Sequence, residues 1–103
     1  MSENSYHVFF TNLANPLKIK IVMKLNQLGN MSVSELRKSL RVEQSKISHA
    51  LASLKKCKIV ESKQEGKQRI YSLNKKTIVP MLKILDGHAQ GFCGKSSCQG
   101  CGR

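Results

Sequence analysis

The sequence is short of acidic residues. It has 6 Asp and Glu against 18 Lys and Arg among 103 residues, which gives a formal net charge of +12. Mutual repulsion on this scale destabilises a compact chain unless an anionic partner compensates it, and nucleic acid is the first candidate for that partner. The acidic residues are scattered, without a converging pair, and no glycine-rich phosphate loop is present. We therefore expect no enzyme.

Long apolar runs are also missing. No stretch reaches the roughly 18 apolar residues that a membrane span requires, and the start MSENSYHVFF has no cationic segment before an apolar run. These absences predict a cytoplasmic protein without a membrane partner. In that compartment the 4 cysteines would be thiols, suited to metal or redox chemistry rather than to a disulfide framework.

The apolar pattern predicts a single domain made mainly of helices. Asn15 before Pro16 and the pair Ser32 and Glu35 have the spacing of helix N-terminal caps. Amphipathic helices are predicted near residues 6–13, 16–28, 33–40, 44–57 and 77–85. The stripe of the second helix that is predicted to be buried comprises Leu17, Ile21, Leu25 and Leu28.

The third and fourth of these helices are separated only by Arg41–Glu43, which is typical of a helix-turn-helix. In the fourth helix Ile47, Leu51 and Leu54 share one stripe, and the opposite face is small, polar and basic. Such a face can enter a major groove without steric or charge conflict. An ordinary solvated helix would look similar, so the flanking elements decide between the two interpretations.

A basic β-hairpin is predicted directly after this helix. The strand-like runs 59–64 and 68–73 surround Glu65–Lys67, and cations occupy Lys63, Lys67 and Arg69. Lysines that protect a sheet edge would explain one or two of these cations, but not the order of the elements. The sequence therefore predicts a mainly α winged helix-turn-helix of about five helices with a two-stranded antiparallel wing that contacts phosphates.

The first and last helices carry more apolar surface than one small domain can bury. The first carries most of the aromatic residues, and the last begins near Lys76 or Thr77 with Pro80 in its first turn. We therefore expect a dimer joined through these helices. Gly87 and Gly91 are expected to loosen the chain, which predicts a folded domain over 1–90 and a flexible Cys- and Gly-rich tail over 91–103. The apolar positions of the two helices are Tyr6, Phe9, Phe10, Leu13, Ile78, Val79, Met81, Leu82, Ile84 and Leu85.

Several segments, in order and at matching spacing, resemble ArsR/SmtB-type transcriptional regulators. They are ELRKSL from Glu35, QSKISHAL from Gln44, Ile59 with Val60, EGK from Glu65 and YSL from Tyr71. The Asn15–Pro16 pair also resembles the start of the family's second helix. The resemblance implies a homodimer, joined through its first and last helices, that binds a palindromic operator in double-stranded DNA as a repressor.

The resemblance also places DNA contacts on individual residues. Because a glutamine amide pairs bidentately with adenine, Gln44 is the best candidate for a base contact, whereas the serines and cations suit phosphate. His49 either donates to DNA or is merely solvated. The implied contacts are Gln44, Ser45, Lys46, Ser48 and His49 in the helix and Lys63, Lys67 and Arg69 in the wing.

Two metal sites of the family are incomplete in this chain. Arg37–Ser39 replaces the cysteine pair that metal-sensing members carry in the third helix. Asp86 and His88 resemble half of a second site, but residues two positions apart on a helix point about 200° from each other. We therefore do not expect these two side chains to chelate one ion.

The tail contains a better set of metal ligands in Cys93, Cys98 and Cys101. Three thiolates suit tetrahedral zinc with a fourth ligand, or another thiophilic metal or metalloid ion. The fourth ligand could be Cys57, His88 or a thiol of a second subunit, although Cys57 also fits a packed position. Redox-active thiols and a tail without a ligand remain alternatives. So do a regulator without a metal effector and a non-specific architectural protein.

Overall fold

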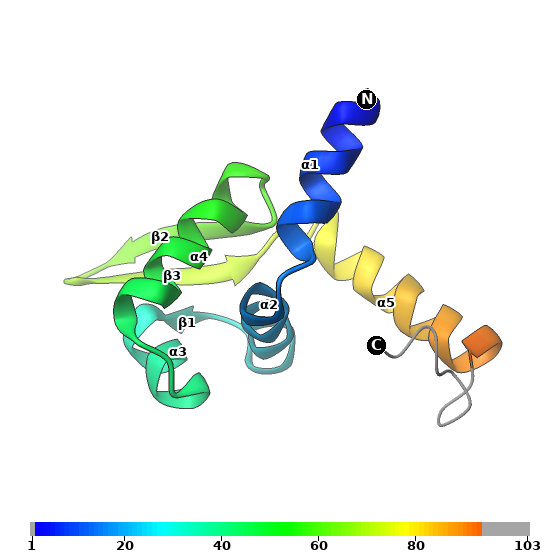
Figure 1. Cartoon of the computed structure of the whole chain (residues 1–103). Coiled ribbons are helices and arrows are strands. Elements are labelled where there is room, and N and C mark those ends of the chain that lie inside the picture. Colours follow the sequence, from blue (N-terminus) through cyan, green and yellow to red (C-terminus); the bar gives the residue numbers. More distant parts are fainter. Residues whose placement is uncertain (1, 94–103) are drawn as a thin grey trace.

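The computed structural model describes residues 2–93, which form helices around a small antiparallel sheet (Figure 1). The described elements are α1 (Glu3–Leu13), α2 (Pro16–Leu28), β1 (Met31–Ser32), α3 (Val33–Leu40), α4 (Gln44–Lys56), β2 (Val60–Glu65), β3 (Gln68–Leu73), α5 (Ile78–His88) and the π-helical turn η1 (Ala89–Cys93). The order of helices with a hairpin after α4 confirms the predicted winged helix-turn-helix. None of the described helices is long and apolar enough to cross a membrane.

Short polar side chains set the helix starts as the sequence predicted. The Asn15 side chain accepts a hydrogen bond from the backbone N–H of Lys18 at the start of α2. At α3, the Ser32 hydroxyl accepts from the Glu35 amide at 3.1 Å, and the Glu35 carboxylate accepts from the Ser32 amide at 2.9 Å. Each cap of this kind stabilises a helix by about 1 kcal/mol.

The corner between α3 and α4 depends on one left-handed residue. Arg41 has φ 56° and ψ 47°, and its N–H bonds to the Arg37 carbonyl. A side chain in this region is uncommon because Cβ crowds the backbone. Val42 follows as a half-buried residue against the core, so the chain turns within three residues and places α4 across α3.

The sheet has a strand that the sequence analysis did not predict. Its order is β1-β3-β2, and β1 pairs with β3 through Met31 opposite Tyr71. β1 is only two residues long and ends at the helix cap, so it has no alternating pattern of its own. Hairpin β2–β3 matches the predicted wing, and its tight turn uses Gly66 at φ 61°.

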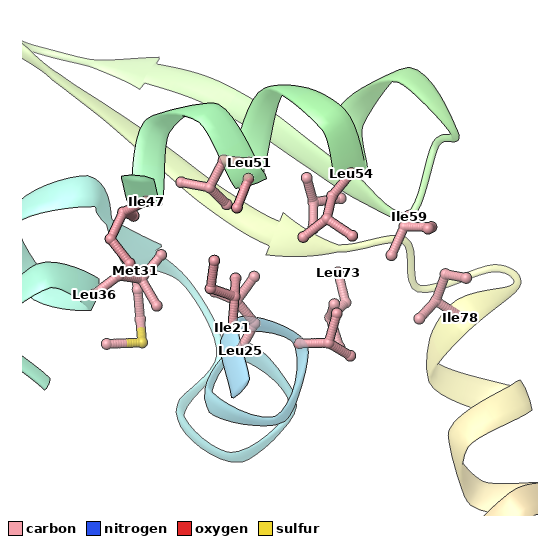
Figure 2. Packing of buried hydrophobic residues seen from close by; sticks show 13 residues of the cluster. Ile21, Leu25, Met31, Leu36, Ile47, Leu51, Leu54, Ile59, Leu73 and Ile78 are labelled. Carbon is pink, nitrogen blue, oxygen red and sulfur yellow. The ribbon is translucent and has the colours of Figure 1, made fainter. Parts of the chain in front are cut away.

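The buried face of α4 lies at the centre of the core. Ile47, Leu51 and Leu54 are each 0% exposed, which confirms the predicted stripe. Figure 2 shows them pointing toward Ile21 and Leu25 of α2. Burying each such side chain contributes about 1.5–3 kcal/mol. Other labelled members of the cluster are Met31, Leu36, Ile59, Leu73 and Ile78, so the other helices and the sheet contribute to one core with α4.

Leu28 was wrongly predicted to be buried. It continues the periodic stripe of α2, but its side chain is 62% exposed, whereas Ile21, Val22 and Leu25 are buried. The last turn of α2 extends beyond the part of the core against which the rest of the helix packs. Periodicity reports which side of a helix an apolar residue is on, and not whether another element lies beside that turn.

Helix α5 leads away from the body (Figure 1). Ile78 anchors its first turn at 3% exposure, and Pro80 lies in that turn as predicted. The helix continues through Gly87, where the chain was expected to loosen; a single glycine inside a helix costs only about 1 kcal/mol relative to alanine. Helical structure reaches Cys93, past the predicted boundary at residue 90, and the rest of the predicted tail (94–103) lies outside the described residues.

Candidate nucleic-acid interface

The first two turns of α4 present the predicted helix contacts on one exposed surface. Because the core stripe faces inward, all five of these side chains lie on the solvent side of the same helix. Glu43, at the N-cap, makes no side-chain cap, so the first backbone N–H groups have no side-chain acceptor there. The five exposed residues are Gln44, Ser45, Lys46, Ser48 and His49.

A cleft joins the start of α4 to the wing. It has a volume of about 210 Å³ and is lined by Gln44 together with Lys67, Gln68 and Arg69. Ser32 of β1, with Val33 and Ser34 of α3, also lines it. The structure therefore places Gln44, the best candidate for a base contact, beside the wing cations Lys67 and Arg69. Contacts to a base edge and to the adjacent DNA backbone need side chains placed together in this way.

A larger cleft lies between α4 and the start of α2. Its volume is about 490 Å³, and Ser45, Lys46 and His49 line it opposite the first turn of α2. From α2 come Leu17 and Lys18, with the cap residue Asn15. The sequence did not predict a place for α2 in the interface, since a capped helix start has no feature that distinguishes a surface role from a purely structural one.

The wing cations do not form a single cluster. In the hairpin register Arg69 lies opposite Gln64, whereas Lys63 lies opposite Ile70. Side chains alternate between the two faces of a strand, so Lys63 projects from the face opposite to that of Arg69. Lys67 lies in the turn between them. Lys67 and Arg69 therefore share the cleft beside Gln44, whereas Lys63 projects from the other face of the wing.

Arg69 also makes a hydrogen bond within the protein. Its Nη1 donates to the Ser62 hydroxyl at 3.2 Å, and Nζ of Lys55 donates to the same oxygen at 2.7 Å. Lys55 belongs to the last turn of α4. This contact, which joins residues seven positions apart, ties the wing to α4 and was not predicted from the sequence.

No metal centre is assembled within residues 2–93, since no three or more His, Cys, Asp or Glu side chains converge there. Asp86 and His88 are exposed on α5. Cys57 is half-buried and its Sγ accepts a 3.1 Å hydrogen bond from Asn12 Nδ2, which fits the packed position considered above. The predicted ligands Cys98 and Cys101, and the side chain of Cys93, lie outside the described part of the chain.

A helix-turn-helix with an exposed polar and basic second helix and an adjoining basic wing is the structure of a DNA-binding protein. Residues 15–62 match the model of the arsR family of bacterial regulatory proteins. The chain is also 30% identical over 77 residues to an uncharacterised HTH-type transcriptional regulator of Methanocaldococcus jannaschii, covering 75% of this chain and 86% of that protein. The chain belongs to the arsR family and is a DNA-binding transcriptional regulator.

Two further proteins are similar over most of the chain. The Biofilm growth-associated repressor of Agrobacterium fabrum is 30% identical over 78 residues, which are 76% of this chain and 66% of the repressor. A solution structure from Mycobacterium bovis, the homodimeric winged helix-turn-helix domain of a possible ArsR-family regulator, has a TM-score of 0.76 at 20% identity. The matched region covers 87% of this chain and 88% of that domain. At 20% identity, this similarity shows that the two proteins share a fold.

Proposed function

We propose that this regulator is a cytoplasmic homodimeric repressor that binds a palindromic operator in double-stranded DNA. The observation that carries the proposal is the shared cleft of Gln44, Lys67 and Arg69. In it a side chain able to pair with a base lies beside cations able to bind the backbone. Ser45, Lys46, Ser48 and His49 extend the same surface along α4, and Lys63 adds a cation on the other face of the wing.

The proposed dimer interface consists of the outer faces of α1 and α5. Tyr6 and Phe10 on α1 are 51% and 57% exposed, and Ile84 and Leu85 on α5 are 72% and 53% exposed. Apolar surface of this kind on two terminal helices is typical of an interface between subunits. The similar domain from Mycobacterium bovis is homodimeric. Two subunits related by a twofold axis would present two α4 helices to half-sites about one DNA turn apart.

The assignment as a repressor is supported by the name of the Agrobacterium fabrum relative. A competition experiment tests it against the alternative of a non-specific architectural protein. Labelled DNA from upstream of the protein's own coding region is bound, and excess unlabelled upstream DNA or random duplex is added at fixed salt. We expect the upstream DNA to compete at least about a thousandfold better. If random duplex competes equally well, the proposal that the protein binds a specific operator is wrong.

For the tail, we propose that Cys93, Cys98 and Cys101 bind zinc or another thiophilic ion. The support is the donor set, since three thiolates within nine residues are soft ligands and glycines separate them. Elemental analysis with a thiol count on anaerobically purified protein tests occupancy. Operator titrations with and without the ion then separate a sensor, in which affinity changes roughly 5–150-fold, from a structural ion with almost no coupling.

A further inference from the structure

A cavity lies where α1 and α2 meet the C-terminal half of α4. Its volume is about 420 Å³, within the range of small-ligand sites. Six of its eight lining residues carry polar or cationic groups, although most of its exposed wall is made of apolar atoms, and Val8 and Cys57 also line it. These side chains are His7 and Thr11 from α1, Asn12 beside them, Lys18 from α2, and Ser53 and Lys56 from α4.

One wall of the cavity is fixed by hydrogen bonds. Nζ of Lys18 donates to Asn12 Oδ1 at 2.6 Å and to the Ser53 hydroxyl at 2.9 Å. Asn12 Nδ2 donates to the Ser53 carbonyl at 2.9 Å. Asn12 is only 8% exposed, so these bonds hold three helices together and position the Lys18 ammonium group at the cavity.

The charge of this wall is not compensated within the cavity. Lys18 is half-buried, its two partners are neutral oxygens, and neither Asp nor Glu is among the residues that line the site. Partial burial of a cation costs free energy unless an opposite charge accompanies it. An ammonium group has three protons to donate, and the two bonds to Asn12 and Ser53 leave one for a ligand. Lys56 adds a second positive charge.

We propose that this cavity binds a phosphate-type oxyanion. Ammonium groups and hydroxyls are the donors that bind phosphate oxygens, and charge-assisted hydrogen bonds are the strongest available here. Lys18 would contact the anion from the fixed wall, with Lys56 and the Thr11 hydroxyl as further donors. The phosphate group could belong to a small free anion or to the DNA backbone, because the cavity opens beside α4 and Lys18 also lines the cleft next to His49.

The proposed dimer leaves this cavity accessible. Val8, which is 50% exposed, lines it, whereas the exposed aromatic residues Tyr6 and Phe10 lie elsewhere on α1. Val8 is two positions from each of them, which is about 200° around a helix. A second subunit packed on Tyr6 and Phe10 would therefore leave the Val8 side of α1 open, with His7 and Thr11 about 100° from that interface. An anion bound there would touch both a dimerisation helix and the DNA-binding helix.

The first test uses inorganic phosphate and the full chain without DNA. Amide spectra are recorded during a phosphate titration at constant ionic strength for the wild type, Lys56→Gln and Lys76→Gln. The last variant removes the same charge in the β3–α5 connection, outside the cavity. If the cavity binds free phosphate, we expect the largest changes in amide chemical shift at Thr11, Asn12, Ser53 and Lys56. Lys56→Gln should weaken binding about tenfold, and Lys76→Gln should leave it unchanged.

The second test measures binding of both variants to operator and random duplex in phosphate-free buffer. If the cavity binds a DNA phosphate, Lys56→Gln weakens binding to both duplexes alike. It also lowers the slope of log affinity against log salt concentration by about one ion, more than Lys76→Gln does. If it takes only a free anion, the two variants bind DNA equally. The proposal is overturned if phosphate shifts are scattered over the surface lysines and the variants also behave alike on DNA. Operator specificity could survive that result, so the proposed function does not fail with it.

Discussion

Nζ of Lys55, in the last turn of α4, donates a 2.7 Å hydrogen bond to the hydroxyl of Ser62 on β2. The same hydroxyl accepts from Arg69 on β3. One short side chain thus joins the helix that carries the proposed base contacts to both strands of the wing. A contact outside the hydrophobic core thus links the wing to α4, in addition to the core packing of Val60 and Leu73.

Replacing Ser62 with Ala should loosen the wing without unfolding the protein. The lost bonds are exposed, so we expect the free energy of unfolding to fall by less than about 1 kcal/mol. Amide hydrogen exchange in β2 and β3 should become about 2–5-fold faster. Ser72→Ala is the matched control, since Ser72 lies opposite Glu61 on the other face of the hairpin. Equal acceleration in the control would show that the Ser62 contact is not responsible.

Gln44 and Lys67 should contribute to DNA binding in different ways. Gln44→Ala should lower discrimination between the operator and a duplex with a substituted contact base by about 1–3 kcal/mol. Lys67→Ala should weaken all duplexes about equally and reduce the dependence of log affinity on log salt concentration. Fluorescence anisotropy over a range of salt concentrations measures both. Similar behaviour of the two variants would refute the division between a base contact and a phosphate contact.

A charge on α5 should separate the proposed dimer. Ile84 is 72% exposed, so Ile84→Glu leaves the fold of one subunit intact but places a carboxylate in the apolar interface. We expect sedimentation velocity to show a monomer, with weakened operator binding because two half-sites are no longer held together. Leu28→Glu introduces the same charge at a 62% exposed leucine of α2 and should leave the dimer intact. Dissociation of both variants would argue against a specific α1–α5 interface.

Two leucines on predicted helical stripes should differ strongly in their importance for stability. Leu51 is 0% exposed in the core, so Leu51→Ala should lower the free energy of unfolding by about 2–5 kcal/mol. Leu28 is 62% exposed, so Leu28→Ala should cost less than about 1 kcal/mol. Urea denaturation followed by circular dichroism compares them. A large loss for Leu28→Ala would mean that a second subunit covers this residue.

Local chemistry in the sequence predicted most of the elements. Asn15 and the Ser32–Glu35 pair cap helices through contacts three residues apart, and the α4 stripe depends only on helical periodicity. Because these interactions are short in range, they are visible in a sequence without knowledge of the fold. The surface of α4 that carries Gln44 follows directly, since it is the side opposite the stripe.

Only the tertiary structure decided what lies beside each surface. The contact of Asn12 with Ser53 joins residues 41 positions apart, and pairing of β1 with β3 joins Met31 to Tyr71. The separation of Lys63 from Arg69 depends on strand register, and the exposure of Leu28 depends on where packing ends. Each of these follows from long-range contacts, which no local pattern encodes. The sequence alone thus determined the DNA-binding helix, whereas the fold determined the clefts, the wing contact and the cationic cavity around it.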